Sequence, residues 1–103
     1  MLEIKIIKPG EAAMVGRFDA SQVDYAKSAL GKLTTTTILD IRDLEYISSA
    51  GLGILLAAQK KLSERGQRLR LANMSKHIRD VFKITRLETI FEIIETKQGG
   101  EPQ

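Results

Sequence analysis

Two serines where a helical pattern begins are the residues of this 103-residue sequence best suited to chemistry. Ser48 and Ser49 follow the apolar Ile47 and precede Ala50-Gly51-Leu52-Gly53. The first turn of a helix has backbone N–H groups without acceptors and about half a positive charge, and both favour a phosphate at that place. The pattern therefore indicates a hydroxyl that could carry a phosphate, while simple capping of the helix by serine is the common alternative.

Two glycines in the same turn are the second unusual feature. Gly51 and Gly53 each cost a helix about 1 kcal/mol relative to Ala. They would allow another backbone to approach the first turn closely, although packing of the helix on a sheet would also explain them. The sequence contains no complete dinucleotide loop, no P-loop and no Gly-x-Ser-x-Gly elbow. No acid–base pair or nucleophile–base spacing is visible either, so we do not expect an enzyme.

The residue composition excludes several further kinds of site. The sequence has no cysteine and one histidine, His77, which excludes thiolate zinc sites, disulfides and Cys-His nucleophile pairs. His77 follows Lys76 at a polar helix start, so we expect it at the surface and predict no metal site and no cofactor. Hydrophobic residues make up 43% and charged residues 28% of the chain, as in globular proteins.

Charge and hydropathy argue against nucleic acid binding and against insertion into a membrane. The net charge is +3, with 6 basic and 7 acidic residues in 1–50 and 10 and 6 in 51–103. Glu64 interrupts the densest basic group and no aromatic residue lies within it, so we interpret it as a solvated face and expect no nucleic acid. That group is Lys60, Lys61, Arg65, Arg68 and Arg70. No apolar run approaches the roughly 20 residues of a membrane span, and the start lacks a signal peptide pattern. We therefore expect a cytoplasmic protein without direct membrane insertion.

The elements before the serines begin with a hairpin. Alternating apolar residues from Leu2 to the turn at Pro9-Gly10 predict a strand, and residues 12–18 predict a second strand that pairs back on it. Asp19 is the expected N-cap of the next helix, and Gln22, three residues later, completes a capping-box pattern. The apolar stripe of that helix consists of Val23, Ala26, Leu30 and Leu33.

The rest of the sequence alternates strands and helices. We expect a buried strand at 35–41, a helix from Ser49 to about Arg65 stopped by Gly66, a strand at 68–73 and a short helix capped by Ser75. Residues 90–94 fit either a last short strand or a helical turn. The order β-β-α-β-α-β-α predicts an α/β domain over residues 1–97 with a mixed sheet of about four to five strands. The tail, residues 98–103, is expected to be disordered.

These residues resemble a known family, the STAS domain, and within it the bacterial anti-sigma factor antagonists, also called anti-anti-sigma factors. The resemblance rests first on Ile38-Leu39-Asp40-Ile41 and on the segment from Ser48-Ser49-Ala50-Gly51 to Leu55. Gly16-Arg17-Phe18-Asp19 is similar to the Gly-x-x-Asp element of the family. Residues 66–73 and 78–87 resemble its later strand and third helix, so the likeness spans nearly the whole chain and implies a STAS-like fold.

The resemblance also implies a function, partner switching, in which Ser49 is the phosphoacceptor. Family members usually carry Asp where this sequence has Ser48, and a neutral hydroxyl there caps the helix without supplying a negative charge. The unmodified protein would bind an anti-sigma factor that is a serine kinase of the GHKL ATPase type, and phosphorylation would end the binding. A serine phosphatase of the PP2C type would reverse it. We expect Asp19, Ser48, Gly51 and Leu52 at the partner interface.

A second function, also implied by the resemblance, is a STAS subunit of a membrane transport or lipid-trafficking complex. In that case the serine would have only a structural role. The basic second half of the sequence is compatible with this alternative.

Overall fold

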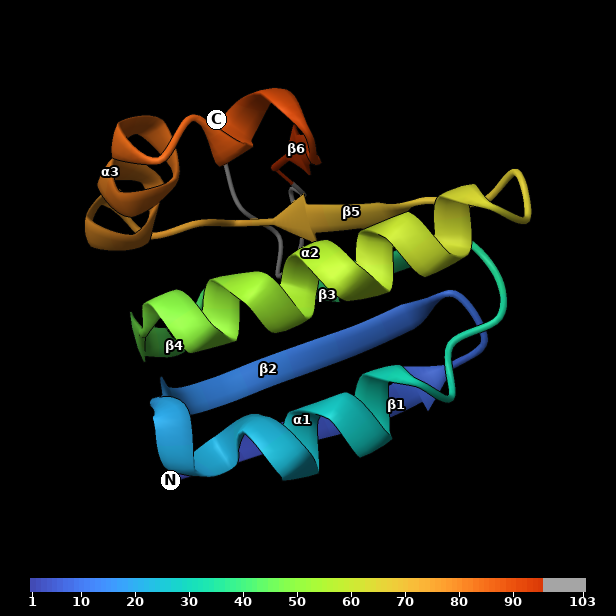
Figure 1. Cartoon of the computed structure of the whole chain (residues 1–103), viewed down its shortest axis with the longest axis horizontal. Coiled ribbons are helices and arrows are strands. Elements are labelled where there is room, and N and C mark those ends of the chain that lie inside the picture. The colour runs from blue at the N-terminus through green and yellow to red at the C-terminus, as the bar shows by residue number, and fades with distance from the viewer. Residues whose placement is uncertain (96–103) are drawn as a thin grey trace, which may run out of the picture.

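Six strands form one mixed sheet in the computed structural model, which describes residues 1–95 (Figure 1). The elements in chain order are β1 (Leu2–Lys8), β2 (Glu11–Phe18), the 3-10 turn η1 (Ala20–Gln22), α1 (Val23–Leu30), β3 (Thr37–Asp40), β4 (Leu44–Ile47), α2 (Ser49–Ser63), β5 (Leu69–Ala72), α3 (Lys76–Ile84), η2 (Leu87–Thr89) and β6 (Glu92–Ile94). This confirms the predicted α/β fold, with β4 as an additional short strand. Of the two alternatives for residues 90–94, the short strand is present, as β6. The predicted tail at 98–103 lies outside the described residues.

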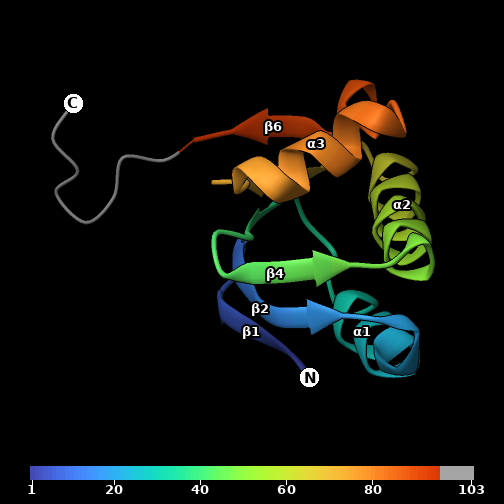
Figure 2. The same ribbon diagram turned by 90° about the vertical axis from the view of Figure 1, so that its left-hand side faces the viewer.

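The sheet order is β1-β2-β3-β5-β6, and β4 pairs with β2 beside β3. Only β1 and β2 are antiparallel, because they are joined by a hairpin; the other pairs are parallel. Figure 2 shows α1 and α2 on the same side of the strands. The core lies between them and the sheet, and its most deeply buried large side chains include Phe18, Leu39, Leu55 and Leu71.

Strand β4 is the main element that the sequence pattern did not predict. Leu44 and Ile47 are buried while Glu45 between them is exposed, so the strand is short and half-buried. It pairs with the last part of β2, whereas β3 pairs with the first part. The two short strands therefore follow one another along β2 and carry the chain to the end of that strand.

The outer edge of β1 is closed by side chains from the start of α1. The Tyr25 hydroxyl accepts a hydrogen bond from the Ile4 N–H at 2.8 Å and donates to the Ile4 carbonyl at 3.4 Å. Gln22 accepts from the Leu2 N–H through Oε1 at 3.2 Å. The predicted capping box is therefore wrong, because the Gln22 side chain reaches β1 instead of the backbone of Asp19. Asp19 caps η1 rather than α1, accepting from the Ser21 N–H at 3.0 Å.

The caps of the two later helices agree with the predictions. Ser48 caps α2 and Ser75 caps α3, each accepting from a first-turn amide. Helix α2 ends at Ser63, and Gly66 follows with φ +73°, a conformation that favours glycine at the end of a helix. His77 is exposed, as expected.

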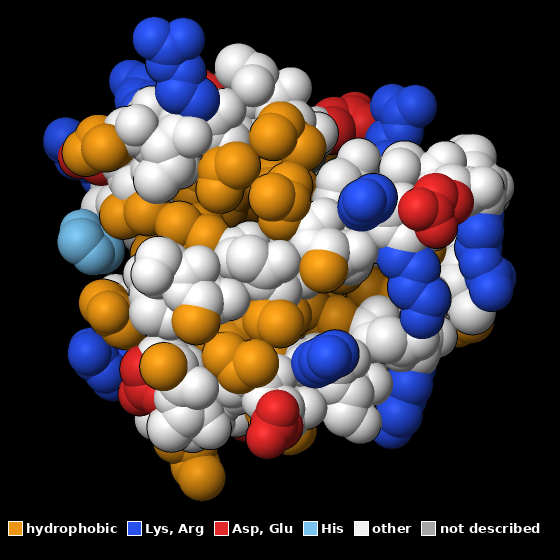
Figure 3. Space-filling view, viewed as in Figure 1, with side chains coloured by type: hydrophobic (Ala, Val, Ile, Leu, Met, Phe, Trp, Pro, Cys, Tyr) orange, Lys and Arg blue, Asp and Glu red, His pale blue; other side chains and the backbone are white. Residues whose placement is uncertain are grey.

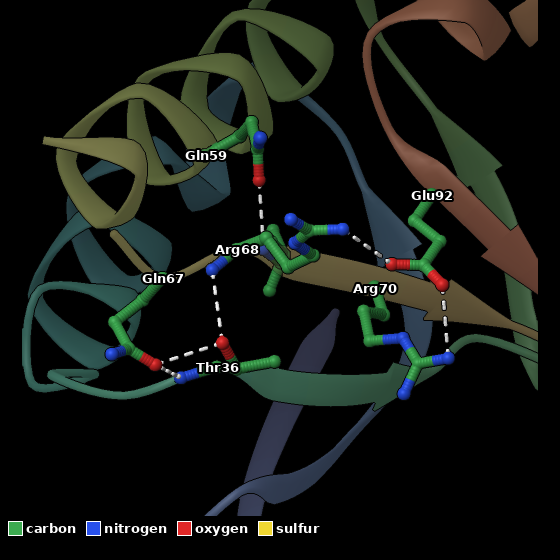
Figure 4. A network of polar contacts seen from close by, with 7 residues as sticks. Thr36, Gln59, Gln67, Arg68, Arg70 and Glu92 are labelled. Carbon is green, nitrogen blue, oxygen red and sulfur yellow. Dashed lines mark hydrogen bonds and ion pairs between the residues drawn. The ribbon is translucent and has the colours of Figure 1, made fainter. Parts of the chain in front are cut away.

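A polar network joins the start of β5 to its neighbours (Figure 4). The Gln67 carbonyl oxygen Oε1 accepts from the Thr36 N–H and from its hydroxyl, both at 2.8 Å. The Glu92 carboxylate on β6 forms ion pairs with two arginines, through Oε1 with Arg68 Nη1 at 3.3 Å and through Oε2 with Arg70 Nη2 at 2.9 Å. These contacts attach the last strand, β6, to β5.

We expect the contribution of Glu92 to stability to be lost in acid. Partial burial of the Glu92 carboxylate raises its pKa, but the hydrogen bonds and charges of Arg68 and Arg70 together outweigh this and leave the pKa below its usual value. A lowered pKa in the folded state stabilises the protein above the unfolded-state pKa, about 4.3, and this stabilisation disappears as the pH falls through the folded value. In urea unfolding, Glu92→Gln should be less stable than the parent chain at neutral pH, and the difference should vanish well below pH 4. A difference that is independent of pH would contradict this reasoning.

Candidate functional site

The predicted serine segment and Asp19 meet at one edge of the sheet. Strands β2 and β4 are parallel, and Phe18 pairs with Ile47 at their last residues. The Ser48 N–H continues this pairing by donating to the Phe18 carbonyl at 2.9 Å. Figure 2 shows β4 leading directly into α2 beside the end of β2. The topology thus places Asp19 next to the start of α2, although the two segments are far apart in sequence.

Ser48 and Ser49 have different roles at this helix start. The Ser48 hydroxyl accepts from the Gly51 N–H at 3.1 Å, and the Ser48 carbonyl accepts from the Leu52 N–H at 2.9 Å. Ser48 is therefore the capping residue. Ser49 is the first residue of α2 and is exposed, and within residues 1–95 its hydroxyl makes no hydrogen bond. The hydroxyl that is free for chemistry is that of Ser49.

Gly51 and Leu52 lie beneath this surface rather than on it. A Cβ added at Gly51 would stand 2.9 Å from Ile47 Cγ1 and 3.0 Å from Phe18 Cγ, so only glycine allows α2 to pack this closely on the ends of β2 and β4. The Leu52 side chain is 7% exposed and belongs to the core. This corrects the expectation that both residues contact a partner, because both lie on the buried face of α2, which packs against the sheet.

The exposed neighbours of Ser49 are Ala50 and Gly53. A Cβ added at Gly53 would meet no atom within 4 Å, so packing within the described residues gives no reason for glycine there. The spacing of four residues from Ser49 to Gly53 puts both on the same helix face, which is the sequence signal that could have identified Gly53 as part of this surface. On α2 itself, the exposed residues beside Ser49 therefore carry no side chain larger than a methyl group.

The two glycines of α2 should respond oppositely to alanine. Gly51→Ala forces a methyl group against Ile47 and Phe18 and should lower the free energy of unfolding by about 1 to 3 kcal/mol. Gly53→Ala adds a methyl group in open space and should raise it by up to about 1 kcal/mol through helix propensity. Urea unfolding of the two variants beside the parent chain measures both. Equal effects of the same sign would show that α2 does not pack as described.

Asp19 supplies a negative charge close to this surface. The Ser21 hydroxyl donates to the Asp19 carboxylate and lowers its pKa; burial opposes this, and the Ser21 N–H adds a second lowering hydrogen bond. Asp19 is thus ionised at neutral pH. Nearby, the Arg17 guanidinium carbon lies 4.6 Å from the centre of the Tyr46 ring, which fixes the side chains that precede Phe18 and Ile47.

The chain is similar to known proteins over most of its length. A family model described as the STAS domain matches residues 11–99. The anti-sigma-B factor antagonist of Listeria monocytogenes is 32% identical over 93 residues, which cover 84% of this chain and 82% of that protein. Within residues 1–95, none of the helices has the length and apolar character needed to cross a bilayer.

Solved structures show the same fold. The anti-sigma factor antagonist SpoIIAA in its unphosphorylated form has a TM-score of 0.70 at 19% identity, covering 98% of this chain and 93% of that chain. The phosphorylated form of SpoIIAA, described as a Bacillus cell fate determinant, has a TM-score of 0.67 at 17% identity, covering 97% and 95%. With a family match over most of its length and a relative above 30% identity, the chain belongs to the STAS domain family, among the anti-sigma factor antagonists.

Proposed function

We propose that this chain is an anti-sigma factor antagonist whose binding is switched off by phosphorylation of Ser49. It is a binding domain and not an enzyme. The observation that carries the proposal is the Ser49 hydroxyl, which is exposed at the first residue of α2 and makes no hydrogen bond within residues 1–95. A kinase could reach this oxygen without any rearrangement of the fold.

A phosphate on Ser49 would act on the partner more than on the domain itself. It adds a charge of about −1.5 to −2 next to the N-terminal amides of α2, where negative charge is stabilising. In an interface that had closed over a small neutral hydroxyl, the same group adds bulk and must lose its water. The bare surface of Ala50 and Gly53 suits a partner that packs closely around the unmodified serine.

The partner in this proposal is an anti-sigma factor that is also an ATP-dependent serine kinase of the GHKL type. Release of the sigma factor would then follow binding of the unmodified chain, and a PP2C-type phosphatase in the cytoplasm would restore that state. The similarity to the anti-sigma-B factor antagonist of Listeria monocytogenes supports this assignment, as do the structures of SpoIIAA in unphosphorylated and phosphorylated forms. Asp19 and Ser48 lie beside Ser49, and we propose that both contact the partner.

The direct test is phosphorylation. The purified chain is incubated with ATP and its cognate kinase, and the modified peptide is identified by mass spectrometry. We expect phosphate on Ser49, and none after Ser49→Ala. Ser63→Ala is the matched control, because it removes an exposed hydroxyl at the opposite end of α2 and should leave the modification of Ser49 in place. Phosphate only on other serines, with Ser49→Ala modified to the normal extent, would refute the proposal.

A further inference from the structure

The end of the molecule opposite Ser49 collects three separate segments, residues 6–11, 27–37 and 59–68, which we call the basic end. These segments contain the β1–β2 turn, the C-terminal ends of α1 and α2, and the residues that lead into β3 and β5. Parallel strands start at a common edge of a sheet, and the helices that connect them end there. Figure 1 shows this end at the right, away from β4 and the start of α2.

Hydrogen bonds fix the three segments to one another. The Ile38 N–H, next to residues 27–37, donates to the Gly10 carbonyl in the β1–β2 turn at 2.8 Å. The Lys61 ammonium group donates to the Gly31 carbonyl at the end of α1 at 3.1 Å. Thr36 is held by Gln67 in the network of Figure 4. The basic end is therefore one continuous surface of the folded chain.

This surface holds more positive charge than the whole chain. Its basic residues are Lys8, Lys27, Lys32, Lys60, Lys61, Arg65 and Arg68, and its acidic residues are Glu11 and Glu64. Seven positive and two negative groups give +5, whereas the full sequence carries +3, so all other residues together carry −2. The positive charge of the sequence is thus concentrated in these segments, and Figure 3 shows several blue side chains along the right-hand side of the molecule, with others at the upper left.

The cations of the basic end are available to a partner. All seven are exposed, and within residues 1–95 five of them form no ion pair: Lys27, Lys32, Lys60, Lys61 and Arg65. Cations at the ends of α1 and α2 also interact favourably with the helix dipoles. That explanation covers residues in the last helical turns, such as Lys60. Lys8 in the hairpin and Arg68 just before β5 are instead paired with Glu11 and Glu92.

Apolar groups lie among these cations. Ile6 and Ile7 are 49% and 56% exposed, beside Lys8 at the end of β1. A recess of about 270 Å³ is lined by Ile6, Pro9 and Leu33, with Lys8 and Lys32 among its lining residues. No aromatic residue occurs in the three segments, so the surface cannot stack nucleic acid bases. Cations around exposed aliphatic side chains fit a bilayer that presents both phosphate headgroups and hydrocarbon.

We propose that the basic end binds peripherally to the surface of a bilayer containing anionic phospholipid. Lysine and arginine side chains near such a surface are attracted to it within about one Debye length, roughly 10 Å at 0.1 M salt. The isoleucines would enter the boundary between headgroups and acyl chains, without any helix crossing the bilayer. In this orientation Ser49 faces away from the membrane, so the binding adds to the proposed switch without depending on it.

The test is flotation of the full chain with lipid vesicles. At low salt we expect binding to vesicles of phosphatidylcholine mixed with phosphatidylserine and little binding to phosphatidylcholine alone. Binding should decrease as salt is added, because the Debye length shortens. The double variant Lys32→Glu with Lys60→Glu should reduce the affinity for the mixed vesicles by at least about twentyfold, since each reversal replaces an attractive charge with a repulsive one.

A matched control is Lys83→Glu with Arg86→Glu. It changes the net charge equally, and each pair includes a lysine in the last turn of a helix and a residue two positions after a helix end. Effects on the helix dipoles are therefore similar in both pairs, and thermal unfolding checks that both variants fold. We expect the control to retain most of the vesicle binding.

Three results would overturn the proposal. The first is no binding to the anionic vesicles at low salt, and the second is equal loss in the two double variants. The third is binding of soluble polyglutamate as tight as that of the vesicles, which would identify an acidic macromolecule rather than a bilayer as the partner. None of these results bears on phosphorylation of Ser49, which is measured separately.

Discussion

Replacing Ser49 with Asp should weaken binding to the anti-sigma factor by more than about a hundredfold. A carboxylate in an interface built around a neutral hydroxyl must be desolvated without a partner charge, and a loss of about 3 kcal/mol corresponds to this change in affinity. Ser49→Ala keeps a small neutral side chain and should bind with nearly the affinity of the parent chain. Isothermal titration with the purified anti-sigma factor measures the three affinities.

Ser49→Asp should weaken binding but make the folded protein more stable. Asp at the first residue of α2 interacts favourably with the helix dipole and should raise the free energy of unfolding by about 0.3 to 1 kcal/mol. Ser63→Asp, at the last residue of α2, is the matched control and should lower stability while leaving binding unchanged. If Ser49→Asp binds as tightly as Ser49→Ala, the hydroxyl does not lie at the interface and the switch at Ser49 is refuted.

The second large effect is expected at Gly16, in the Gly-x-x-Asp element. Its φ is +105°, and a Cβ there would stand 2.2 Å from the Met1 carbonyl oxygen, which is backbone and cannot easily move. The Gly16 N–H donates to the Asp43 carbonyl at 3.0 Å, at the register shift that joins β2 to β4. Gly16→Ala should therefore lower the free energy of unfolding by about 3 kcal/mol or more.

Gly66→Ala separates the two causes of this effect. Gly66 also has a positive φ, +73°, but a Cβ there would meet nothing within 4 Å. Gly66→Ala should lower the free energy of unfolding by about 1 to 2 kcal/mol, which is the cost of placing a residue with a Cβ at a positive φ. Urea unfolding of both variants gives the comparison, and circular dichroism at low temperature detects a Gly16→Ala chain that is already unfolded. Similar losses for the two variants would mean that the contact with Met1 is not tight.

Local signals in the sequence were sufficient for most of the fold. Hydrophobic spacing predicted the long helix α2, and Ser75 predicted the start of α3, because both depend on residues close together in the chain. The serine at the start of α2 could also be selected from sequence, since the chemistry of a helix N-terminus is local. The resemblance to the family already separated Ser48 as the cap from Ser49 as the phosphoacceptor, and the coordinates add the capping hydrogen bond of Ser48 and the exposure of Ser49.

The features that sequence reasoning missed depend on contacts between distant segments. Strand β4 forms because its four residues pair with the last part of β2, which β3 leaves unpaired. The alternation of Leu44-Glu45-Tyr46-Ile47 is too short to predict this pairing by itself. The side chain of Gln22 bonds to β1, twenty residues away, in place of the local capping box. The burial of Gly51 likewise depends on Phe18, which only the sheet topology brings underneath it.

The contacts of Tyr25 and Gln22 with β1 determine which part of the molecule can recruit a partner. An open sheet margin can accept an extended peptide or a second copy of the chain as an added strand. Here the Ile4 N–H and carbonyl and the Leu2 N–H are already occupied, and the register shift between Ile6 and Lys8 interrupts the remainder. Strand addition at this margin is therefore blocked, so a partner that approaches β1 must contact side chains instead of extending the sheet.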